Sequence, residues 1–256
     1  MLKFGYTTIF AAALLIVTIA ADIIYGVPVY LYAALFLLYS LAVFYGCYFI
    51  GSDFFIHVIC SANTDKKEIA ISFDDGPAEY TPQILQILKD SNIKSAFFCI
   101  GRNIKGNEEV LKQLHQEGHI IGNHSFSHHF WFDMFPYKKM IADLQLMDVA
   151  VKEVIGLQPK LFRPPYGVTN PTVRKSIING SYTPVGWSVR SMDTVTKDEE
   201  RLLEKINGKI KPGAVFLFHD TSKVTLNILP AFIKQVKENG YQIVRLDKML
   251  NLQPYA

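Results

Sequence analysis

Hydrophobic and polar positions divide the chain into an apolar N-terminal part and a longer part in which short apolar runs alternate with amphipathic stretches. Residues 6–21 and 27–49 include no charged side chain. Because roughly 20 apolar residues cross the hydrocarbon core of a bilayer, the pattern predicts two transmembrane helices joined by a tight turn. A signal peptide is the alternative for the first run, with Lys3 as its charged region and small residues near Ala20 as its cleavage site.

After residue 66 the apolar runs are short, and each predicts a buried strand. The stretches between them have apolar residues at helical spacing and carry helix-start signals. Thr81 before Pro82 and Asn170 before Pro171 are expected N-caps, and Thr196 with Glu199 fits a capping box. The expected strands are 68–73, 95–100, 120–123, 161–163, 182–189, 214–218 and 241–246, and further helices are expected over 107–117, 140–155 and 231–239.

Strands that alternate with helices predict parallel pairing, and about seven such units predict a closed or nearly closed β/α barrel. An open doubly wound sheet is the alternative fold. We expect a membrane anchor over residues 1–51, a linker over 52–65 and one catalytic domain over 66–256. A domain of roughly 200 residues is large enough to bury its own core.

Charge and cysteine content exclude several classes of protein. The formal net charge is only +3 and is scattered, so no nucleic-acid partner is expected. The three cysteines, Cys47, Cys60 and Cys99, form neither a disulfide framework nor a zinc knot. No protein partner is predicted.

Two adjacent carboxylates, Asp74 and Asp75, end the first expected strand of the domain and precede Gly76 and Pro77. Neighbouring side chains on a strand point to opposite sides, so one carboxylate could hold a metal ion while the other moves protons. A simple turn is the alternative, because Asp, Gly and Pro favour turns. His124, His128, Arg163, Asp193 and His219 follow, most of them at or just past the end of another apolar run.

His124 and His128 are four residues apart, a spacing that brings two side chains to one side of a helical turn. With Asp75 they would form a set of one carboxylate and two imidazoles that leaves coordination positions open for water and substrate. We expect a divalent cation, zinc first, with cobalt, nickel or manganese as alternatives.

Four ordered motifs between residues 66 and 250 resemble those of the polysaccharide deacetylase family, carbohydrate esterase family 4, whose members share a NodB-like domain. The resemblance implies a distorted (β/α)7-type barrel (NodB-like) preceded by the two transmembrane helices. The segments that match the family's Asp-Asp-Gly-Pro, paired-histidine, Arg-containing and Leu-X-His motifs are Ser72 to Pro77, His124-Ser-Phe-Ser-His128, Arg163-Pro-Pro-Tyr166 and Leu217-Phe-His219.

The resemblance also implies a role for each matched residue. Asp74 would be the general base, oriented by Arg163, and Asp75 a metal ligand beside His124 and His128. The general acid would be His219, oriented by Asp193. The backbone N–H of Tyr166 would stabilise the oxyanion, and Leu217 would border the substrate.

One family motif is altered. After Trp187 the family carries two Asp and then a Trp, whereas this chain has Arg190 at the first acidic place, Asp193 at the second and Thr194 at the Trp. Gaining a cation and losing an aromatic face changes the substrate cleft more than the reaction, although Arg190 as an exposed loop cation is the alternative.

The resemblance implies metal-dependent hydrolysis of N-acetyl groups from amino sugars of a peptidoglycan- or chitooligosaccharide-like glycan, with release of acetate. The alternatives are a deacylase acting on a lipid-linked sugar or an O-acetyl ester, and a membrane-anchored glycan-binding protein without activity. We expect a multi-pass cell-membrane protein with an extracytoplasmic catalytic domain. The charges Lys3, Lys66 and Lys67 that flank the spans favour the opposite orientation.

Overall fold

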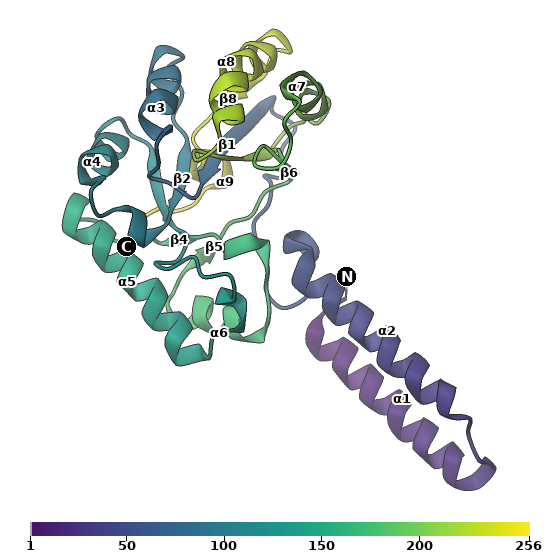
Figure 1. Cartoon of the computed structure of the whole chain (residues 1–256). Coiled ribbons are helices and arrows are strands. Elements are labelled where there is room, and N and C mark those ends of the chain that lie inside the picture. The colour runs from purple at the N-terminus through teal and green to yellow at the C-terminus, as the bar shows by residue number, and fades with distance from the viewer. Residues whose placement is uncertain (1) are drawn as a thin grey trace.

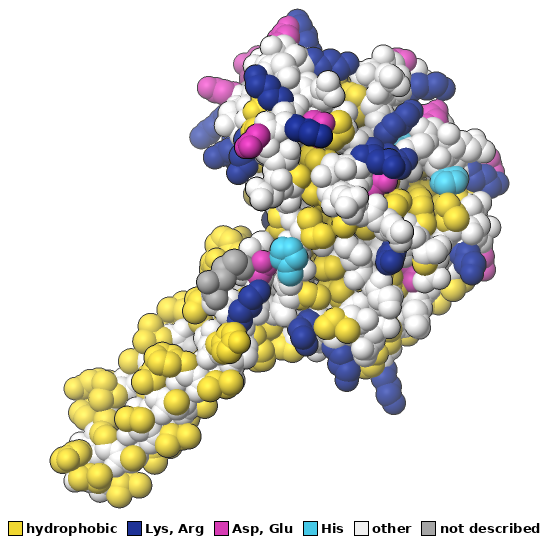
Figure 2. Space-filling model, turned by 180° about the vertical axis from the view of Figure 1, so that it is seen from behind, with side chains coloured by type: hydrophobic (Ala, Val, Ile, Leu, Met, Phe, Trp, Pro, Cys, Tyr) yellow, Lys and Arg dark blue, Asp and Glu magenta, His cyan; other side chains and the backbone are white. Residues whose placement is uncertain are grey.

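The computed structural model describes residues 2–256 and shows a helical hairpin that projects from an α/β domain (Figure 1). Helices α1 (Phe4–Tyr25) and α2 (Val29–Tyr48) form the hairpin, and their mean hydropathies are 2.2 and 1.8. Their exposed side chains form a nearly continuous hydrophobic surface, whereas charged side chains cover much of the domain (Figure 2). Both helices are therefore long and apolar enough to cross a membrane, as a membrane anchor requires.

The domain is built on one parallel sheet with the order β5-β4-β3-β2-β1-β7-β6, and β8 pairs with the start of β1. The central strand β1 lies between β2 and β7, so its carboxyl end has neighbours on both sides. The strands are β1 (Glu68–Asp74), β2 (Ala96–Cys99), β3 (Ile120–Asn123), β4 (Leu161–Phe162), β5 (Thr183–Pro184), β6 (Val189–Arg190), β7 (Val215–His219) and β8 (Gln242–Ile243).

Helices cover the outside of the curled sheet (Figure 1). They are α3 (Thr81–Asp90), α4 (Glu108–Gln116), α5 (Tyr137–Ile155), α6 (Pro171–Asn179), α7 (Glu199–Asn207) and α8 (Lys223–Glu238), whereas the short α9 (Leu246–Leu250) packs its Leu246 with Ala70 on the other face of the sheet. The alternation of β1 sends Ile71 and Phe73 into the apolar layer beneath these helices, and Ala70 into a second cluster inside the barrel. Asp74, one position beyond Phe73, is thereby directed to the inner side of the sheet.

The two edge strands come close enough for residues 185–188 to join them directly. Val185 donates its N–H to Phe162 beside β5, and Ser188 donates to Val215 on β7. The sheet therefore curls into a distorted barrel, as predicted, and is not an open doubly wound sheet, although β5 and β6 do not pair with each other. The single strand expected over 182–189 is wrong, because the chain leaves one edge of the sheet and joins the other within that stretch.

Residues 52–65, predicted as a linker, lie along the domain. Phe54 and Val58 are buried, Ile59 forms a parallel bridge with Val185, and Ser61 forms an antiparallel bridge with Ala214. This segment therefore lines the gap between the edge strands. The domain boundaries themselves stay a prediction.

Some predicted helix starts are wrong, while Asn170 does cap α6 by accepting the Val173 N–H. Thr81 is the first residue of α3, and its hydroxyl accepts from the Ala78 N–H at 2.8 Å instead of capping the helix. Asp198, not Thr196, caps α7.

The last long helix begins well before residue 231. Ser222 caps α8, which starts at Lys223 and continues through Pro230. Proline has no backbone N–H to donate within a helix, so it is common in the first turn and disfavoured further along. Pro230 therefore predicted a helix that starts near residue 231. Packing of the apolar face of α8 against the sheet outweighs that local preference.

Candidate active site

The carboxyl ends of the parallel strands bring the predicted polar residues to one end of the barrel. Asp74 ends β1 and pairs in register with His219 at the end of β7. Arg163 directly follows β4, which lies on the other side of β1 from β7 in the strand order. Its Nη1 donates to Oδ1 of Asp74 at 2.7 Å. Barrel enzymes place their chemistry at this end.

Arg163 is fully buried and all three of its nitrogens have partners. Nη1 also donates to the Ser72 hydroxyl at 2.9 Å, Nη2 donates to the Gly186 carbonyl at 2.8 Å, and Nε donates to the Val185 carbonyl at 3.2 Å. Burial raises the pKa of Asp74, and the charge of Arg163 opposes that rise. Because Arg163 occupies Oδ1, the other oxygen of Asp74 is free to face the site.

Asp75, His124 and His128 offer ligand atoms that all lie within 4.8 Å of one another. Oδ1 of Asp75 is 3.5 Å from Nε2 of His124 and 3.4 Å from Nε2 of His128. This oxygen is buried and has no hydrogen-bond partner among residues 2–256. A buried carboxylate oxygen without a partner is costly unless a cation or donor occupies the space beside it.

Both imidazoles are suited to bind a cation. Burial, followed by the neighbouring His128, lowers the pKa of His124 to about 3, and burial also lowers the pKa of His128. Nδ1 of His124 donates to the Arg163 carbonyl at 2.7 Å, which leaves the Nε2 lone pair facing Asp75. One carboxylate and two neutral imidazoles therefore fit a divalent metal with open coordination positions.

The two histidines do not share a helical turn, so the reason given for their proximity was wrong. Ser125 and His128 have φ values of 66° and 42°, and the segment between them is a loop. The buried carboxylate of Asp143 accepts the Phe126 N–H at 2.8 Å, and the Ser125 hydroxyl accepts the His128 N–H at 3.0 Å. The imidazoles are brought together instead by a turn with two left-handed residues, which a hydrogen bond to Asp143 of α5 stabilises.

His219 and Asp193 form a second hydrogen-bonded pair. Nδ1 of His219 lies 2.8 Å from Oδ1 of Asp193, and the His219 backbone N–H donates to Oδ2 at 2.7 Å. The hydroxyls of Ser191 and Thr225 also donate to this carboxylate. Burial alone would lower the pKa of His219, but the hydrogen bond and charge of Asp193 raise it to about 8.

Tyr166 borders the metal-ligand cluster, whereas Leu217 is buried within β7. The backbone of Tyr166 has φ 60° and ψ 0°, a left-handed conformation that non-glycine residues adopt at a cost. Its ring centroid is 4.8 Å from that of His128, and its side chain is 44% exposed. The oxyanion role of Tyr166 and the substrate contact of Leu217 stay predictions.

Ser72, Asp143 and Asp220 also support the site, although none of them was a predicted site residue. Ser72 is the inward residue two positions before Asp74, and Asp143 is a carboxylate on the buried face of α5. Asp220 is fully buried, accepts from the Thr81 hydroxyl at 2.6 Å and packs against Gly76. Burial raises the pKa of Asp220 to about 7. The signal that could have identified these residues is a polar side chain at a position where the sequence pattern predicts burial.

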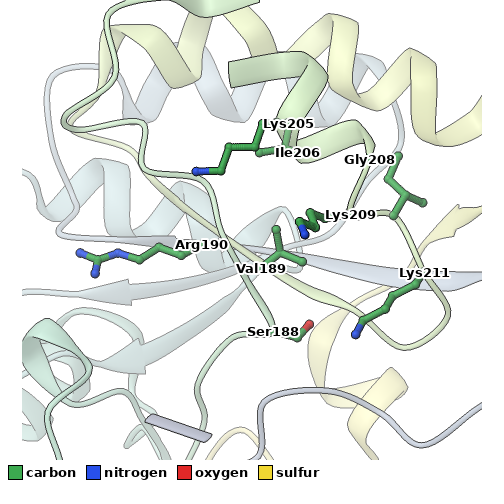
Figure 3. A pocket seen from close by; sticks show the side chains of 9 residues that line it. Ser188, Val189, Arg190, Lys205, Ile206, Gly208, Lys209 and Lys211 are labelled. Carbon is green, nitrogen blue, oxygen red and sulfur yellow. The ribbon is translucent and has the colours of Figure 1, made fainter. Parts of the chain in front are cut away.

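Arg190 is exposed on the edge strand β6. Its guanidinium lies 5.8 Å from the centroid of the Trp187 ring. The guanidinium of Arg163 lies 5.7 Å from the same centroid. Arg190 also lines a pocket of about 440 Å³ together with Lys205, Lys209 and Lys211, as Figure 3 shows. The altered motif thus contributes to a strongly basic region at the edge of the barrel.

This chain is similar to known proteins both in sequence and in fold. The family described as Polysaccharide deacetylase matches residues 61–185. The peptidoglycan-N-acetylmuramic acid deacetylase PdaA of Bacillus subtilis is 32% identical, and the alignment covers 73% of each chain. A crystal structure of the Bc1960 peptidoglycan N-acetylglucosamine deacetylase superposes with a TM-score of 0.72 and 30% identity, over 78% of this chain and 95% of that one.

A third relative with the same fold is not described as an active enzyme. The protein BA3943 of Bacillus anthracis, described as a pseudoenzyme of carbohydrate esterase family 4, superposes with a TM-score of 0.69 and 26% identity, over 75% of this chain and 68% of that one. Fold alone therefore does not establish activity. The sequence match and the shared barrel together show that this chain belongs to the polysaccharide deacetylase family, the NodB-like carbohydrate esterases of family 4.

Proposed function

We propose that the chain hydrolyses N-acetyl groups of amino sugars in a peptidoglycan- or chitooligosaccharide-like glycan, releasing acetate and leaving an amine. The observation that carries the proposal is the unpartnered Oδ1 of Asp75 between His124 and His128, next to a buried carboxylate and a buried histidine. Names of relatives, which include peptidoglycan deacetylases, support the same class of substrate.

The cluster of Asp75, His124 and His128 would hold the divalent cation, and zinc is the ion we expect there. When bound, such an ion makes water more acidic and polarises an amide carbonyl. The Asp75 carboxylate supplies a negative charge, and the Arg163 carbonyl fixes the orientation of the His124 ring.

Asp74 is the proposed general base. Its Oδ1 is occupied by Arg163, while its Oδ2 lies 3.8 Å from Nε2 of His124 and so faces the cluster. A water molecule beside this oxygen would give up its proton to Asp74 as it attacks the acetyl carbon. Arg163 keeps Asp74 from rotating away.

His219 is the proposed general acid. Its Nδ1 is bonded to Asp193, so the proton on Nε2 is the one available for transfer. That proton would pass to the sugar nitrogen as the carbon–nitrogen bond breaks, so acetic acid and a neutral amine form while Asp74 is protonated and His219 is neutral. Loss of the Asp74 proton to solvent and uptake of one proton by His219 restore the site, and acetic acid ionises to acetate on release. Asp193 acts through His219 by fixing its tautomer and stabilising its charge. The backbone N–H of Tyr166 would stabilise the oxyanion.

A glycan-binding protein without activity is the second candidate, since a pseudoenzyme with this fold exists. In this chain Asp74, Arg163, Asp193 and His219 keep buried, mutually bonded positions. Such an arrangement of perturbed titratable groups favours catalysis over binding alone.

We further propose that α1 and α2 span the cell membrane and that the domain is extracytoplasmic. Almost no residue of either helix is buried by the rest of the chain, so their apolar surfaces need another environment. A glycan of the cell wall would be available only on the outer side.

The first prediction concerns the reaction. Purified full chain, with zinc supplied, should release acetate from N-acetylated chitooligosaccharides or peptidoglycan, and a chelator should abolish the release. The measurement is acetate production across a panel of N-acetylated and O-acetylated glycans. Release from O-acetyl esters only would assign the alternative deacylase, and binding without release would assign the inactive protein.

The second prediction separates the two adjacent carboxylates. Asp75→Asn should lose bound metal, and excess zinc should restore part of its activity. Asp74→Asn should keep its metal yet lose roughly 10²–10⁴-fold in turnover, because a general base is removed. Elemental analysis of both variants decides the assignment: equal metal loss would mean that both carboxylates are ligands.

The third prediction concerns pH. His219 must be protonated to act, and its pKa is raised to about 8, so activity should decline as the pH rises through about 8. Asp74 must be ionised, so activity should also decline on the acidic side. A pH–rate profile of His219→Ala should lack the basic limb. Retention of that limb in the variant would assign it to another group.

The fourth prediction concerns orientation. A protease added to intact cells should digest the domain while the hairpin stays protected. Digestion only after lysis would place the domain inside, as Lys3, Lys66 and Lys67 favour.

A further inference from the structure

One wall of the candidate site continues into an exposed apolar loop. Phe130, Trp131 and Met134 are 68%, 55% and 69% exposed. The Phe130 ring lies 6.2 Å from the Tyr166 ring and 4.7 Å from the Trp131 ring. This apolar loop, residues 130–134, follows the ligand candidate His128 by two residues. Three large apolar side chains facing solvent on one loop indicate contact with something outside the chain.

The apolar loop is connected to the end of the helical hairpin. Thr169 donates its hydroxyl to the Gly46 carbonyl at 3.1 Å and its backbone N–H to the Cys47 carbonyl at 3.2 Å. The next residue, Asn170, donates its side-chain amide to the Asp133 carbonyl within the loop at 2.6 Å. Two consecutive residues therefore join the carboxyl end of α2 to the apolar loop. Because α2 would leave the bilayer at that end, these contacts would bring the loop close to the membrane surface.

Basic side chains accompany the same part of the domain. Arg174 of α6 lines a pocket with Lys3 and Phe4 at the start of α1. Lys139 lies 3.7 Å above the Phe135 ring, directly after the apolar loop. Lysine and arginine near a bilayer are attracted to anionic headgroups, while Trp and Phe favour the interface itself. The combination fits a lipid surface better than a soluble partner.

We infer that the apolar loop inserts into the surface of the membrane that anchors the chain, and that the substrate is an amino sugar carried by a lipid of that same membrane. The inference rests on the proposed deacetylation and names its substrate class. Tyr166 and His128 open beside the loop, so a sugar attached to a lipid headgroup would enter the site without leaving the surface. The membrane anchor would then hold the site and the substrate at the same distance from the bilayer surface.

Contact with lipid has a readout that is independent of catalysis. The chain has only two tryptophans, Trp131 and Trp187, and the latter packs against Gly167 inside the domain. The full chain is reconstituted into vesicles with and without brominated phosphatidylcholine. Brominated lipid should quench the wild-type emission, whereas Trp131→Phe should show no quenching. Equal quenching of both proteins, or quenching of neither, would overturn the insertion of the loop.

The substrate class is tested with two probes, N-acetylglucosamine linked through diphosphate to a polyprenol in vesicles, and soluble chitotetraose. Trp131→Ser with Met134→Ser should lose roughly tenfold in rate on the lipid-linked probe, because apolar contact with the bilayer is removed. Its rate on chitotetraose should be unchanged. The control Leu146→Ser removes an apolar side chain that is 54% exposed on α5 and should alter neither rate.

The outcomes separate this inference from the proposed reaction. Equal losses on both probes would assign the apolar loop to sugar binding and overturn the inference, while deacetylation itself would stand. A wild-type chain that acts on chitotetraose and not on the lipid-linked probe would also overturn it. Failure of the wild type on every acetylated probe would reject the reaction, while the quenching result would still decide whether the loop contacts lipid.

Discussion

The buried ion pair between Arg163 and Asp74 is the constraint on which the rest of the site depends. Taking both charges out of water costs several kcal/mol for each ion, and the loss is offset only where every donor and acceptor has a partner. Here one guanidinium joins Ser72 on β1 to the carbonyls of Val185 and Gly186 in the stretch between β5 and β6. Removing one partner of such a pair typically costs about 3–5 kcal/mol. The same contacts thus support both the barrel and Asp74, the proposed base.

The backbone of Arg163 extends this constraint to the proposed metal ligands. Its carbonyl accepts from Nδ1 of His124, so the residue that fixes Asp74 also sets the tautomer of a ligand candidate. On the opposite side of β1, the neighbouring strand β7 carries His219 in register with Asp74. The proposed base and acid therefore lie at the ends of β1 and β7, while the segments that follow β1 and β3 supply the candidate ligands Asp75, His124 and His128.

The order of strands and helices and the list of candidate residues could be predicted from the sequence, because apolar runs and motif order are local signals. What could not be predicted depended on contacts between distant segments. The turn between His124 and His128 is held by Asp143, which lies in another element. The expected strand over 182–189 is interrupted because its two ends hydrogen-bond to opposite edges of the sheet. The start of α8 was predicted too late because Pro230 disfavours a helix interior locally, whereas packing of α8 against the sheet favours the helix.

The stretch 185–188 limits how relatives with this fold can change in length. Loops at the surface usually accept insertions and deletions without loss of the fold. This stretch does not qualify, because it must span the two edges of the sheet while Val185 and Gly186 keep their carbonyls on Arg163. Variation in length should instead accumulate after Asp193, where Val195 is exposed. Divergence in substrate choice would then concentrate on one side of the mouth of the barrel, and the opposite side would change only by single substitutions.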